Sequence, residues 1–422
     1  MKKLLIISPY FPPVNAADMQ RVRMSLPYLA DLGWYAEIVT VAPEYTDLPQ
    51  DELLLQSVPA SVKIYYVKAL RKSITAKAGL GSIALRSLWY YKQKINDILK
   101  QTPFDLIYFS TTQFPVCILG AYWKRRFGIP YVIDMQDPWH SDYYIGKPKD
   151  QRPPKYWFAY RLNKYLEPVA IKNTDGLISV SAGYIDQLKL RYPKIKKIPS
   201  AVITFGAFAP DLKIARDNQQ RFIPLLDAGY INIVYVGRGG RDMHKAIQPV
   251  FEAFKAALQN NQIRFSKVKF HFIGTSYAPS GHGIPTILPL AERCGIGESV
   301  VEITDRISYY HALLTLQQAD ALFIPGSDDP QYTASKIFPS LLTGKPALAV
   351  FNKASSAISI MREYGVQHVY NYEDVISADL SAFFDQLVNG SFDEVNYNAD
   401  ALKKYSAAEM TRAQCILFDK II

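Results

Sequence analysis

Short apolar runs alternate with amphipathic stretches along most of the 422-residue chain. The run from Leu4 to Ile7 ends at Pro9, and the amphipathic helix predicted from Met19 to Asp31 closes at Gly33. Strands are then predicted at 38–41, 64–67, 106–109, 131–133 and 177–180, and helices near 82–100, 116–127 and 155–172. Apolar strands separated by helices predict a parallel, doubly wound sheet.

The segment from Pro199 to Gly229 interrupts this alternation with prolines, glycines and polar residues, as an interdomain linker does. The alternation then begins again, with strands predicted at 231–236, 268–273, 300–303, 321–324 and 347–351, and helices from 243 and at 287–294, 309–318 and 335–342. The fold class expected is therefore α/β, with two Rossmann-like domains facing a central cleft at the carboxyl ends of both sheets. The domain ranges expected are 1–200, a linker at 201–229, 230–398, and a C-terminal helix at 399–422 that packs back on the first domain.

Composition narrows the class of protein. With 49% hydrophobic and 20% charged residues, the chain is expected to fold rather than remain disordered. Its longest apolar run, Val116 to Trp123, is shorter than the roughly 18 to 20 residues that a membrane-spanning helix needs. Three cysteines without a Cys-x-x-Cys pair fit a reducing compartment, so a cytoplasmic location is expected.

Positive charge is concentrated in the first half of the chain. Residues 1–200 hold 28 Lys and Arg against 16 Asp and Glu, whereas residues 201–422 hold 20 against 22. Such a field suits anionic lipid headgroups, nucleic acid or phosphorylated substrates, and general solubility is the alternative. The cluster Lys124-Arg125-Arg126 follows an apolar helix face, which favours peripheral contact with an anionic membrane surface. No nucleic-acid partner is expected, because helix-turn-helix, zinc-finger and RNA-recognition motifs are absent from the sequence.

A glycine-rich turn at 236–241 is the first candidate binding motif. It follows a predicted strand and precedes a helix, so backbone N–H groups at Gly237 and Gly239 can approach an anion. Arg238, Arg241 and Lys245 would supply the cations that a diphosphate requires. The fingerprint Gly-x-Gly-x-x-Gly is absent, which disfavours a nicotinamide cofactor. The alternative is an ordinary glycine turn with solvated arginines.

A second candidate anion or sugar site lies at 325–336, where a predicted strand ends in a polar loop before a helix. Thr333 or Ser335 would cap that helix and face a phosphate, and Asp328 and Asp329 would accept hydrogen bonds from sugar hydroxyls. Adjacent Asp and Pro residues are also ordinary turn formers, so a plain loop remains the alternative.

The segment 134–140 also ends a predicted strand. It brings two carboxylates, Asp134 and Asp137, the aromatic Trp139 and the imidazole of His140 to one sheet edge, which favours general-base or hydroxyl-binding roles. Strand termination and packing are the alternative. No Asp-x-Asp triplet and no zinc-ligand spacing occur in the sequence, so no metal is expected.

Several of these segments resemble family 4 glycosyltransferases in order and spacing, across nearly the whole chain. The similar residues are Ile7-Ser8-Pro9-Tyr10-Phe11-Pro12-Pro13, Gln20-Arg21-Val22-Arg23, Leu29-x-x-Leu32-Gly33-Trp34, Asp137-Pro138-Trp139, Val236-Gly237-Arg238, residues 319–325, Ser335-Lys336-Ile337-Phe338 and Thr343-Gly344-Lys345-Pro346. The resemblance implies a GT-B fold and a hexosyltransferase that is metal-independent, needs no cofactor and transfers a sugar from a nucleotide sugar with retention of configuration.

The resemblance also implies roles for individual residues. It places the diphosphate near Gly237, Arg238, Lys245 and the helix after Tyr332, and the acceptor near Arg21, Asp137 and His140. Together with the motifs above, the donor-binding residues expected are Gly237, Gly239, Arg241, Asp328, Asp329, Tyr332, Thr333, Ser335 and Lys336, the acceptor-binding residues Arg21, Asp134 and Trp139, and the catalytic residues Asp137, His140, Arg238 and Lys245. The acceptor would be a saccharide or lipid-linked hydroxyl in cell-surface polysaccharide or glycolipid synthesis.

Two departures from the family pattern leave other functions open. The paired glutamates of the family fall near Gln331 and Pro339, and residues Asn15-Ala16-Ala17-Asp18 stand where the family commonly has glycines. A catalytically silent binding or scaffold protein is therefore one alternative. A sugar-nucleotide epimerase on the same fold is another, because that chemistry also breaks the bond to the diphosphate.

Overall fold

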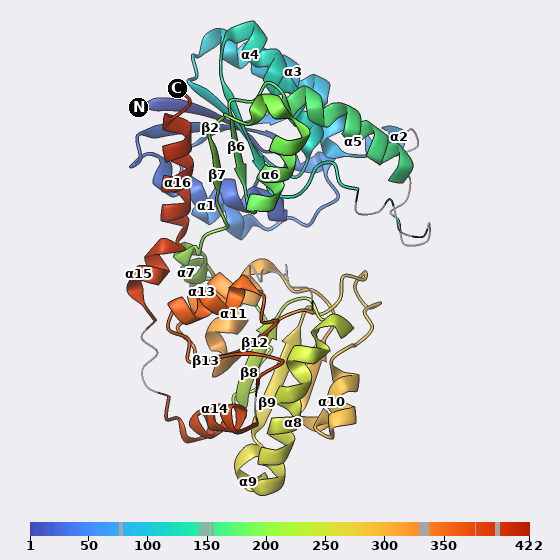
Figure 1. Ribbon diagram of the computed structural model, residues 1–422, viewed down its shortest axis with the longest axis vertical. Coiled ribbons are helices and arrows are strands. Elements are labelled where there is room, and N and C mark those ends of the chain that lie inside the picture. The colour runs from blue at the N-terminus through green and yellow to red at the C-terminus, as the bar shows by residue number, and fades with distance from the viewer. Residues whose placement is uncertain are drawn as a thin grey trace. The chain divides into compact units, whose positions relative to one another are not determined.

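The computed structural model describes residues 1–75, 79–142, 145, 148, 152, 156–328, 337–375, 377–392 and 397–422. The chain divides into two compact units, one of Met1–Gly206 with Ala407–Ile422 and the other of Ala207–Ser406. It therefore passes between the units twice (Figure 1). Within the described ranges no helix is long and apolar enough to cross a bilayer.

The first unit is built on a seven-stranded sheet in the order β3-β2-β1-β4-β5-β6-β7. Every neighbouring pair is parallel. The strands are β1 (Lys2–Ile7), β2 (Trp34–Val41), β3 (Lys63–Val67), β4 (Leu106–Ser110), β5 (Tyr131–Met135), β6 (Gly176–Ser179) and β7 (Ser200–Val202). The central strands β4 and β5 are buried along their whole length, as parallel strands covered on both faces must be.

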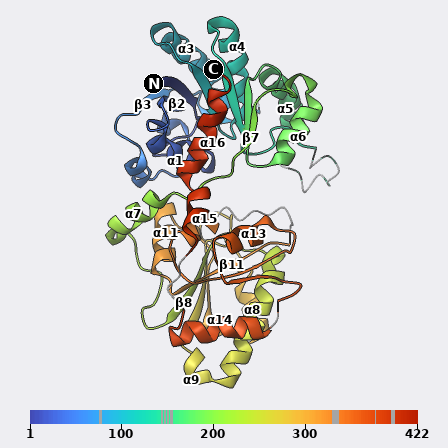
Figure 2. The same cartoon turned by 60° about the vertical axis from the view of Figure 1, so that its left-hand side comes forward.

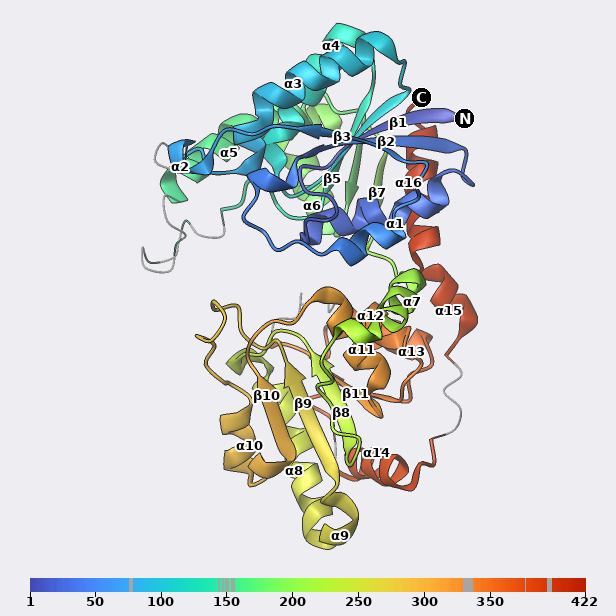
Figure 3. The same ribbon diagram turned by 180° about the vertical axis from the view of Figure 1, so that it is seen from behind.

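Helices cover both faces of this sheet. One face carries α3 (Ile83–Gln101), α4 (Ile118–Phe127) and α5 (Tyr156–Ile171), whose apolar sides form a core with the sheet around Tyr91, Trp123 and Ile171. The other carries α1 (Gln20–Leu29) and α16 (Ala407–Asp419), which lie side by side in Figures 2 and 3. The short α2 (Lys72–Thr75) and α6 (Ala182–Arg191) complete the unit.

The second unit holds a six-stranded parallel sheet in the order β10-β9-β8-β11-β12-β13. Its strands are β8 (Ile231–Val236), β9 (Val268–Ile273), β10 (Val300–Ile303), β11 (Ala321–Pro325), β12 (Ala347–Phe351) and β13 (His368–Asn371). On one side α8 (His244–Asn260), α10 (Leu288–Cys294) and α14 (Ser377–Asn389) enclose a phenylalanine-rich core, with the short α9 (Gln262–Phe265) after α8. On the other side lie α11 (Tyr309–Gln318), α12 (Ile337–Leu341), α13 (Ser356–Glu363) and α15 (Ala399–Lys404).

The predicted α/β class with two Rossmann-like halves is confirmed, because both sheets are parallel and both carry helices on two faces. The segment expected to be a linker differs from the expectation. It begins within β7, and it contains α7 (Ala209–Asp217), which packs against α11 through hydrogen bonds from Tyr309 and Tyr310 to Asp211. These residues therefore belong to the two units.

Candidate functional site

The first candidate site lies where β4 and β5 end. The parallel register places Ser110 beside Asp134, and Ser110 Oγ donates a 2.9 Å hydrogen bond to Asp134 Oδ2. Arg21 Nε, from α1 on one face of the sheet, lies 2.7 Å from the same oxygen. Both side chains of this ion pair are fully buried. The pair therefore joins α1 to the carboxyl edge of the sheet.

Arg21 also fixes the chain that follows β7. Its Nη2 donates to the carbonyl oxygen of Ile203 at 2.8 Å, its Nη1 donates to that of Thr204 at 3.3 Å, and the guanidinium lies 4.7 Å from the Phe205 ring centre. The acceptor contacts expected for Arg21 and Asp134 therefore stay a prediction. In the structure the two side chains bond to each other and to the surrounding protein, except that Asp134 Oδ1 has no hydrogen-bond partner among the described residues. Both residues hold the sheet edge in position.

Asp18 is a buried carboxylate that the sequence reasoning did not select. Thr111 Oγ1 donates to its Oδ2 at 2.8 Å, and the backbone N–H and hydroxyl of Thr112 donate at 3.0 and 3.2 Å. Gln136 Nε2 donates to the Asp18 carbonyl oxygen at 3.0 Å. Burial raises the pKa of Asp18 above its ordinary value, although the threonine hydrogen bonds oppose the shift.

Asp137 and Trp139 line one pocket of about 450 Å³ at this edge. Trp139 Nε1 donates to Asn163 Oδ1 at 3.2 Å, and the indole stacks on Phe114 with ring centres 5.5 Å apart. Asp137 is exposed, yet desolvation by its surroundings and the nearby Asp18 carboxylate raise its pKa. A carboxylate beside an aromatic wall can accept a hydrogen bond from a sugar hydroxyl and act as a general base.

His140 contacts a different part of the first unit. Its backbone N–H donates to Glu167 Oε2 at 3.0 Å, and its carbonyl oxygen accepts from Arg191 at 3.3 Å. The centre of its imidazole ring lies 4.7 Å from the ring centre of Tyr160. Burial lowers the pKa of His140, so the neutral imidazole is favoured. The 450 Å³ pocket beside Asp137 is not lined by His140, which instead shares a small cavity with Glu167 and Arg191.

The glycine-rich turn of the second unit follows β8. Gly237 N–H donates to the Ile273 carbonyl oxygen at 2.8 Å and Gly239 N–H to that of Thr275 at 2.9 Å, so the turn continues the ladder beside β9. Both N–H groups expected to face an anion are therefore bonded within the protein. A Cβ at Gly239 would lie 2.8 Å from Thr275 Cβ, and one at Gly240 would lie 2.3 Å from Asp242 Oδ1. Close packing therefore explains the glycines at 239 and 240.

Arg238 forms an ion pair with Asp242, which lies four residues further along the chain. Asp242 is not among the site residues predicted from the sequence. Arg238 Nη1 and Nη2 lie 3.1 and 2.6 Å from the two carboxylate oxygens. Ser327 Oγ donates to the same carboxylate at 2.9 Å, and Asp328 N–H donates to the Asp242 carbonyl oxygen at 2.9 Å. Burial would raise the pKa of Asp242, but the hydrogen bonds from Arg238 and Ser327 and the guanidinium charge lower it overall.

This network joins the loop after β8 to the loop after β11, which are the two loops where the sequence predicts a donor site. The remaining cations of the turn, Arg241 and Lys245, are exposed, and no ion pair joins either to another described residue. Five predicted donor residues lie outside the described residues, namely Asp329, Tyr332, Thr333, Ser335 and Lys336, as does Gln331. Pro339 lies in α12 and is half-buried.

Solved structures resemble the chain over its full length. The N-terminal domain of Candida albicans trehalose-6-phosphate phosphatase aligns over 100% of this chain and 97% of its own, with a TM-score of 0.60 and 11% identity. A UDP-forming trehalose-phosphate synthase from Burkholderia xenovorans, in complex with glucose-6-phosphate, covers 99% and 100% with a TM-score of 0.57 and 11% identity. Anabaena HepE, in complex with UDP, covers 100% of both chains with a TM-score of 0.56 and 14% identity.

The chain has the GT-B fold. Neither a protein-family model nor a curated protein matches the sequence. At these identities the likeness carries the fold alone, because one fold hosts many functions. Any function of this chain depends on the residues at the two sheet edges.

Proposed function

We propose that this GT-B protein is a retaining glycosyltransferase that moves a hexose from a nucleotide sugar to a hydroxyl acceptor. The observation that carries the proposal is the network of Arg238, Asp242 and Ser327, which holds two loops together at the carboxyl edge of the second sheet. Arg241 and Lys245 add exposed positive charge beside it. Ligands bind at this edge in open α/β sheets, and a diphosphate requires cations there.

In this proposal the second unit holds the donor. The guanidinium of Arg238 is kept in one orientation by Asp242, and Lys245 lies in the first turn of α8. Negative charge develops on the diphosphate as the bond to the sugar breaks, so these cations would stabilise the transition state more than the ground state. Asp328, which the Asp242 carbonyl oxygen holds in place, would accept hydrogen bonds from the sugar.

The first unit would hold the acceptor. Asp137 would orient the attacking hydroxyl, with Trp139 as the wall of the neighbouring pocket. Retention of configuration requires the hydroxyl to attack on the face that the diphosphate leaves. The acceptor would be a saccharide or lipid-linked hydroxyl in polysaccharide or glycolipid synthesis, reached at an anionic membrane surface on the cytoplasmic side through the basic first unit.

Nucleotide binding is the first test. We expect nucleoside diphosphates of one base, and the corresponding nucleotide sugars, to raise the melting temperature. A ligand that binds only the folded state adds about 2.7 kcal/mol to the free energy of unfolding at 100 times its dissociation constant. The variants Arg238→Ala and Lys245→Ala are expected to lose transfer while remaining folded. Lys267→Ala is the matched control, because Lys267 is an exposed cation of the same unit just before β9, at the amino end of the sheet. Unchanged turnover in both site variants would contradict the proposal.

A silent binding or scaffold protein is the second candidate, and Pro339 is the observation that favours it. At that position the similar family carries a glutamate, and proline offers no side-chain group to a ribose. Binding of a nucleotide without turnover across many donors and acceptors would favour this reading. Product analysis without an acceptor separates transfer from epimerisation, because only an epimerase converts the nucleotide sugar into its epimer.

A further inference from the structure

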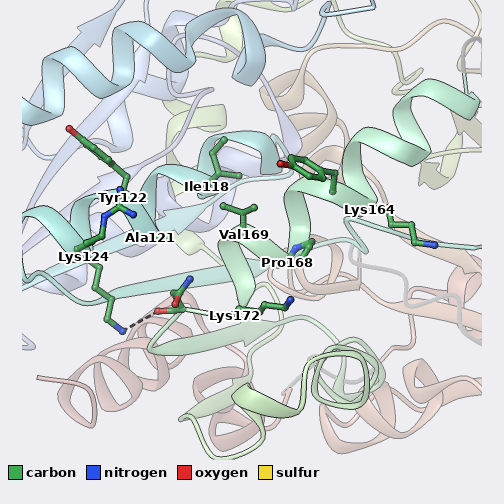
Figure 4. A pocket seen from close by; sticks show the side chains of 11 residues that line it. Ile118, Ala121, Tyr122, Lys124, Lys164, Pro168, Val169 and Lys172 are labelled. Carbon is green, nitrogen blue, oxygen red and sulfur yellow. Dashed lines mark hydrogen bonds between the residues drawn. The ribbon is translucent and has the colours of Figure 1, made fainter.

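A groove lies between α4 and α5 (Figure 4). It has a volume of about 930 Å³ and belongs entirely to the first unit. Its apolar lining comes from Ile118 and Ala121 of α4 and from Pro168 and Val169 of α5. None of the predicted donor, acceptor or catalytic residues lines it.

Four cations surround this apolar lining. Lys124 is held in place, because its Nζ lies 2.6 Å from Asp175 Oδ1 and donates to the Asn173 carbonyl oxygen at 3.0 Å. Arg125, Lys164 and Lys172 are exposed, and among the described residues none of them has an ion-pair partner. Three positive charges beside the groove are therefore available to an anion.

The imbalance of charge extends over the whole helical face. Helices α3, α4 and α5 carry nine Lys and Arg residues, of which only Arg86 is buried, against the acids Asp97 and Glu167. Glu167 is buried and bound to Arg191, so it does not offset the surface charge. Lys92 on α3 lies over the ring of Tyr122, which lines the groove, at 4.6 Å.

Aromatic and aliphatic side chains stand exposed among these cations. Tyr165, which lines the groove, is 73% exposed, and Val169 is 42% exposed. Trp157 near the start of α5 is 65% exposed and Trp89 on α3 is 62% exposed. Basic residues interspersed with exposed aromatic rings are the composition of surfaces that bind the interface of an anionic bilayer.

We propose that the groove between α4 and α5 binds the headgroup of an anionic phospholipid in a bilayer, with Arg125, Lys164 and Lys172 on the phosphate and Tyr165 and Val169 against the apolar part. This inference rests on the proposed function, in which the protein works at an anionic membrane, and it identifies the surface that would contact that membrane. Charge complementarity selects the anion, and the apolar lining selects a lipid over a free phosphate.

The test is sedimentation of the full chain with vesicles of phosphatidylcholine alone or mixed with phosphatidylglycerol. We expect binding to the mixed vesicles only, weakened by added salt. Each cation near an anionic surface contributes about five-fold in affinity, so Arg125→Ala, Lys164→Ala and Lys172→Ala together are expected to weaken binding about 100-fold. Tyr165→Ser alone is expected to weaken binding as well.

The matched control replaces Lys194, Lys196 and Lys197 by alanine, which removes the same charge from three exposed positions of the same unit. We expect a much smaller loss. An equal loss would mean that diffuse charge drives binding, and it would overturn the groove as a site. Inorganic phosphate that competes fully at constant salt, or an oligonucleotide that binds through the same three cations while vesicles do not, would overturn it too.

Measuring sugar transfer to a soluble acceptor, without vesicles, tests the proposed function independently of lipid binding. The triple groove variant is expected to keep its turnover in solution, because its residues lie outside the candidate site. Vesicle binding with no turnover would support the lipid-binding groove and contradict the proposed transferase activity. Turnover with no vesicle binding would support the activity and contradict the groove.

Discussion

Arg21 and Asp134 form a fully buried ion pair at the edge of the first sheet. Removing one partner leaves the other charge buried without compensation, which costs about 3 to 5 kcal/mol. We expect Arg21→Met and Asp134→Asn each to destabilise the first unit by this amount. All five tryptophans (Trp34, Trp89, Trp123, Trp139 and Trp157) lie in that unit, so their fluorescence during urea unfolding measures its stability.

The double variant distinguishes a specific pair from two independent losses. Because each single variant strands the remaining charge, replacing both residues is expected to cost less than the sum of the two. Arg125→Met is the control, since it removes an exposed cation of the same unit and is expected to stay within about 0.5 kcal/mol of the parent. Additive costs would show that Arg21 acts through its bonds to Ile203 and Thr204 instead.

Asp18 makes the stability of the first unit depend on pH. Its folded-state pKa is raised, so the carboxyl binds its proton more tightly in the folded than in the unfolded protein. The stability from that proton is present below the ordinary value of 3.8 and is lost as the pH rises through the folded-state pKa.

Asp18→Asn removes this titration. We expect the stability of the parent relative to the variant to fall as the pH rises above 3.8, by up to about 1.4 kcal/mol per pH unit until the carboxyl is ionised. Tryptophan fluorescence in urea at a series of pH values measures the difference. A difference that is constant with pH would show that the threonine hydrogen bonds cancel the effect of burial.

The sequence predicts which polar residues follow the strands, but it does not predict which side chains bond to them. Asp134 and Asp137 follow a predicted strand, so their place at the sheet edge could be predicted. That Arg21 would neutralise Asp134 could not, because 113 positions of chain separate the two residues and only the packing of α1 on the sheet brings them together. Asp18 was missed for the same reason, since its hydrogen-bond donors lie beyond β4.

The last helix, α16, completes the first unit from the far end of the chain. Phe418 is fully buried, with its ring centre 5.5 Å from that of Trp34 and 5.1 Å from that of Tyr108. Gln414 Nε2 donates to Ser25 Oγ on α1 at 2.9 Å. Without this helix the face around Trp34 would meet solvent.

We expect Phe418→Ala to destabilise the first unit by about 3 to 5 kcal/mol, because a buried ring is lost and a cavity remains. Ile416→Ala is the control on the same helix, since Ile416 is 51% exposed and its replacement is expected to cost little. Tryptophan fluorescence follows both. Equal stability of the two variants would mean that α16 does not contribute to the core.

Elements with a strong hydrophobic period were predicted from sequence, and those that depend on their neighbours were not. Strand β8 and helix α11 match the predicted ranges, since β8 is apolar except at Asn232 and α11 buries apolar residues at helical spacing. Strand β7 has only three residues, and none of them is buried. The sequence predicts a linker in place of helix α7 because of Pro210, which lies in the first turn of that helix, where proline is favoured.

At the level of the whole molecule, the two units differ in charge and in the ligands proposed for them. The net charge of about +12 lies in residues 1–200, where the lipid groove and the acceptor pocket are proposed. Residues 201–422 are close to neutral, with 20 cations and 22 acids, and the diphosphate is proposed to meet only a local cluster there. The anionic membrane and the nucleotide would therefore use separate surfaces of the chain.

If the nucleotide and the membrane use separate surfaces, nucleotide binding is expected to stabilise the second unit directly. A nucleoside diphosphate on the loops after β8 and β11 is expected to slow hydrogen exchange in residues 237–245, because the bound loops open less often. Arg238→Ala is expected to abolish that protection, whereas Lys267→Ala is expected to retain it. The edge of the first unit at Asp137 serves as the internal comparison, measured by mass spectrometry on the same samples. Protection that appears at Asp137 but not at 237–245 would place the nucleotide on the first unit, and the roles proposed for the two sheets would have to be exchanged.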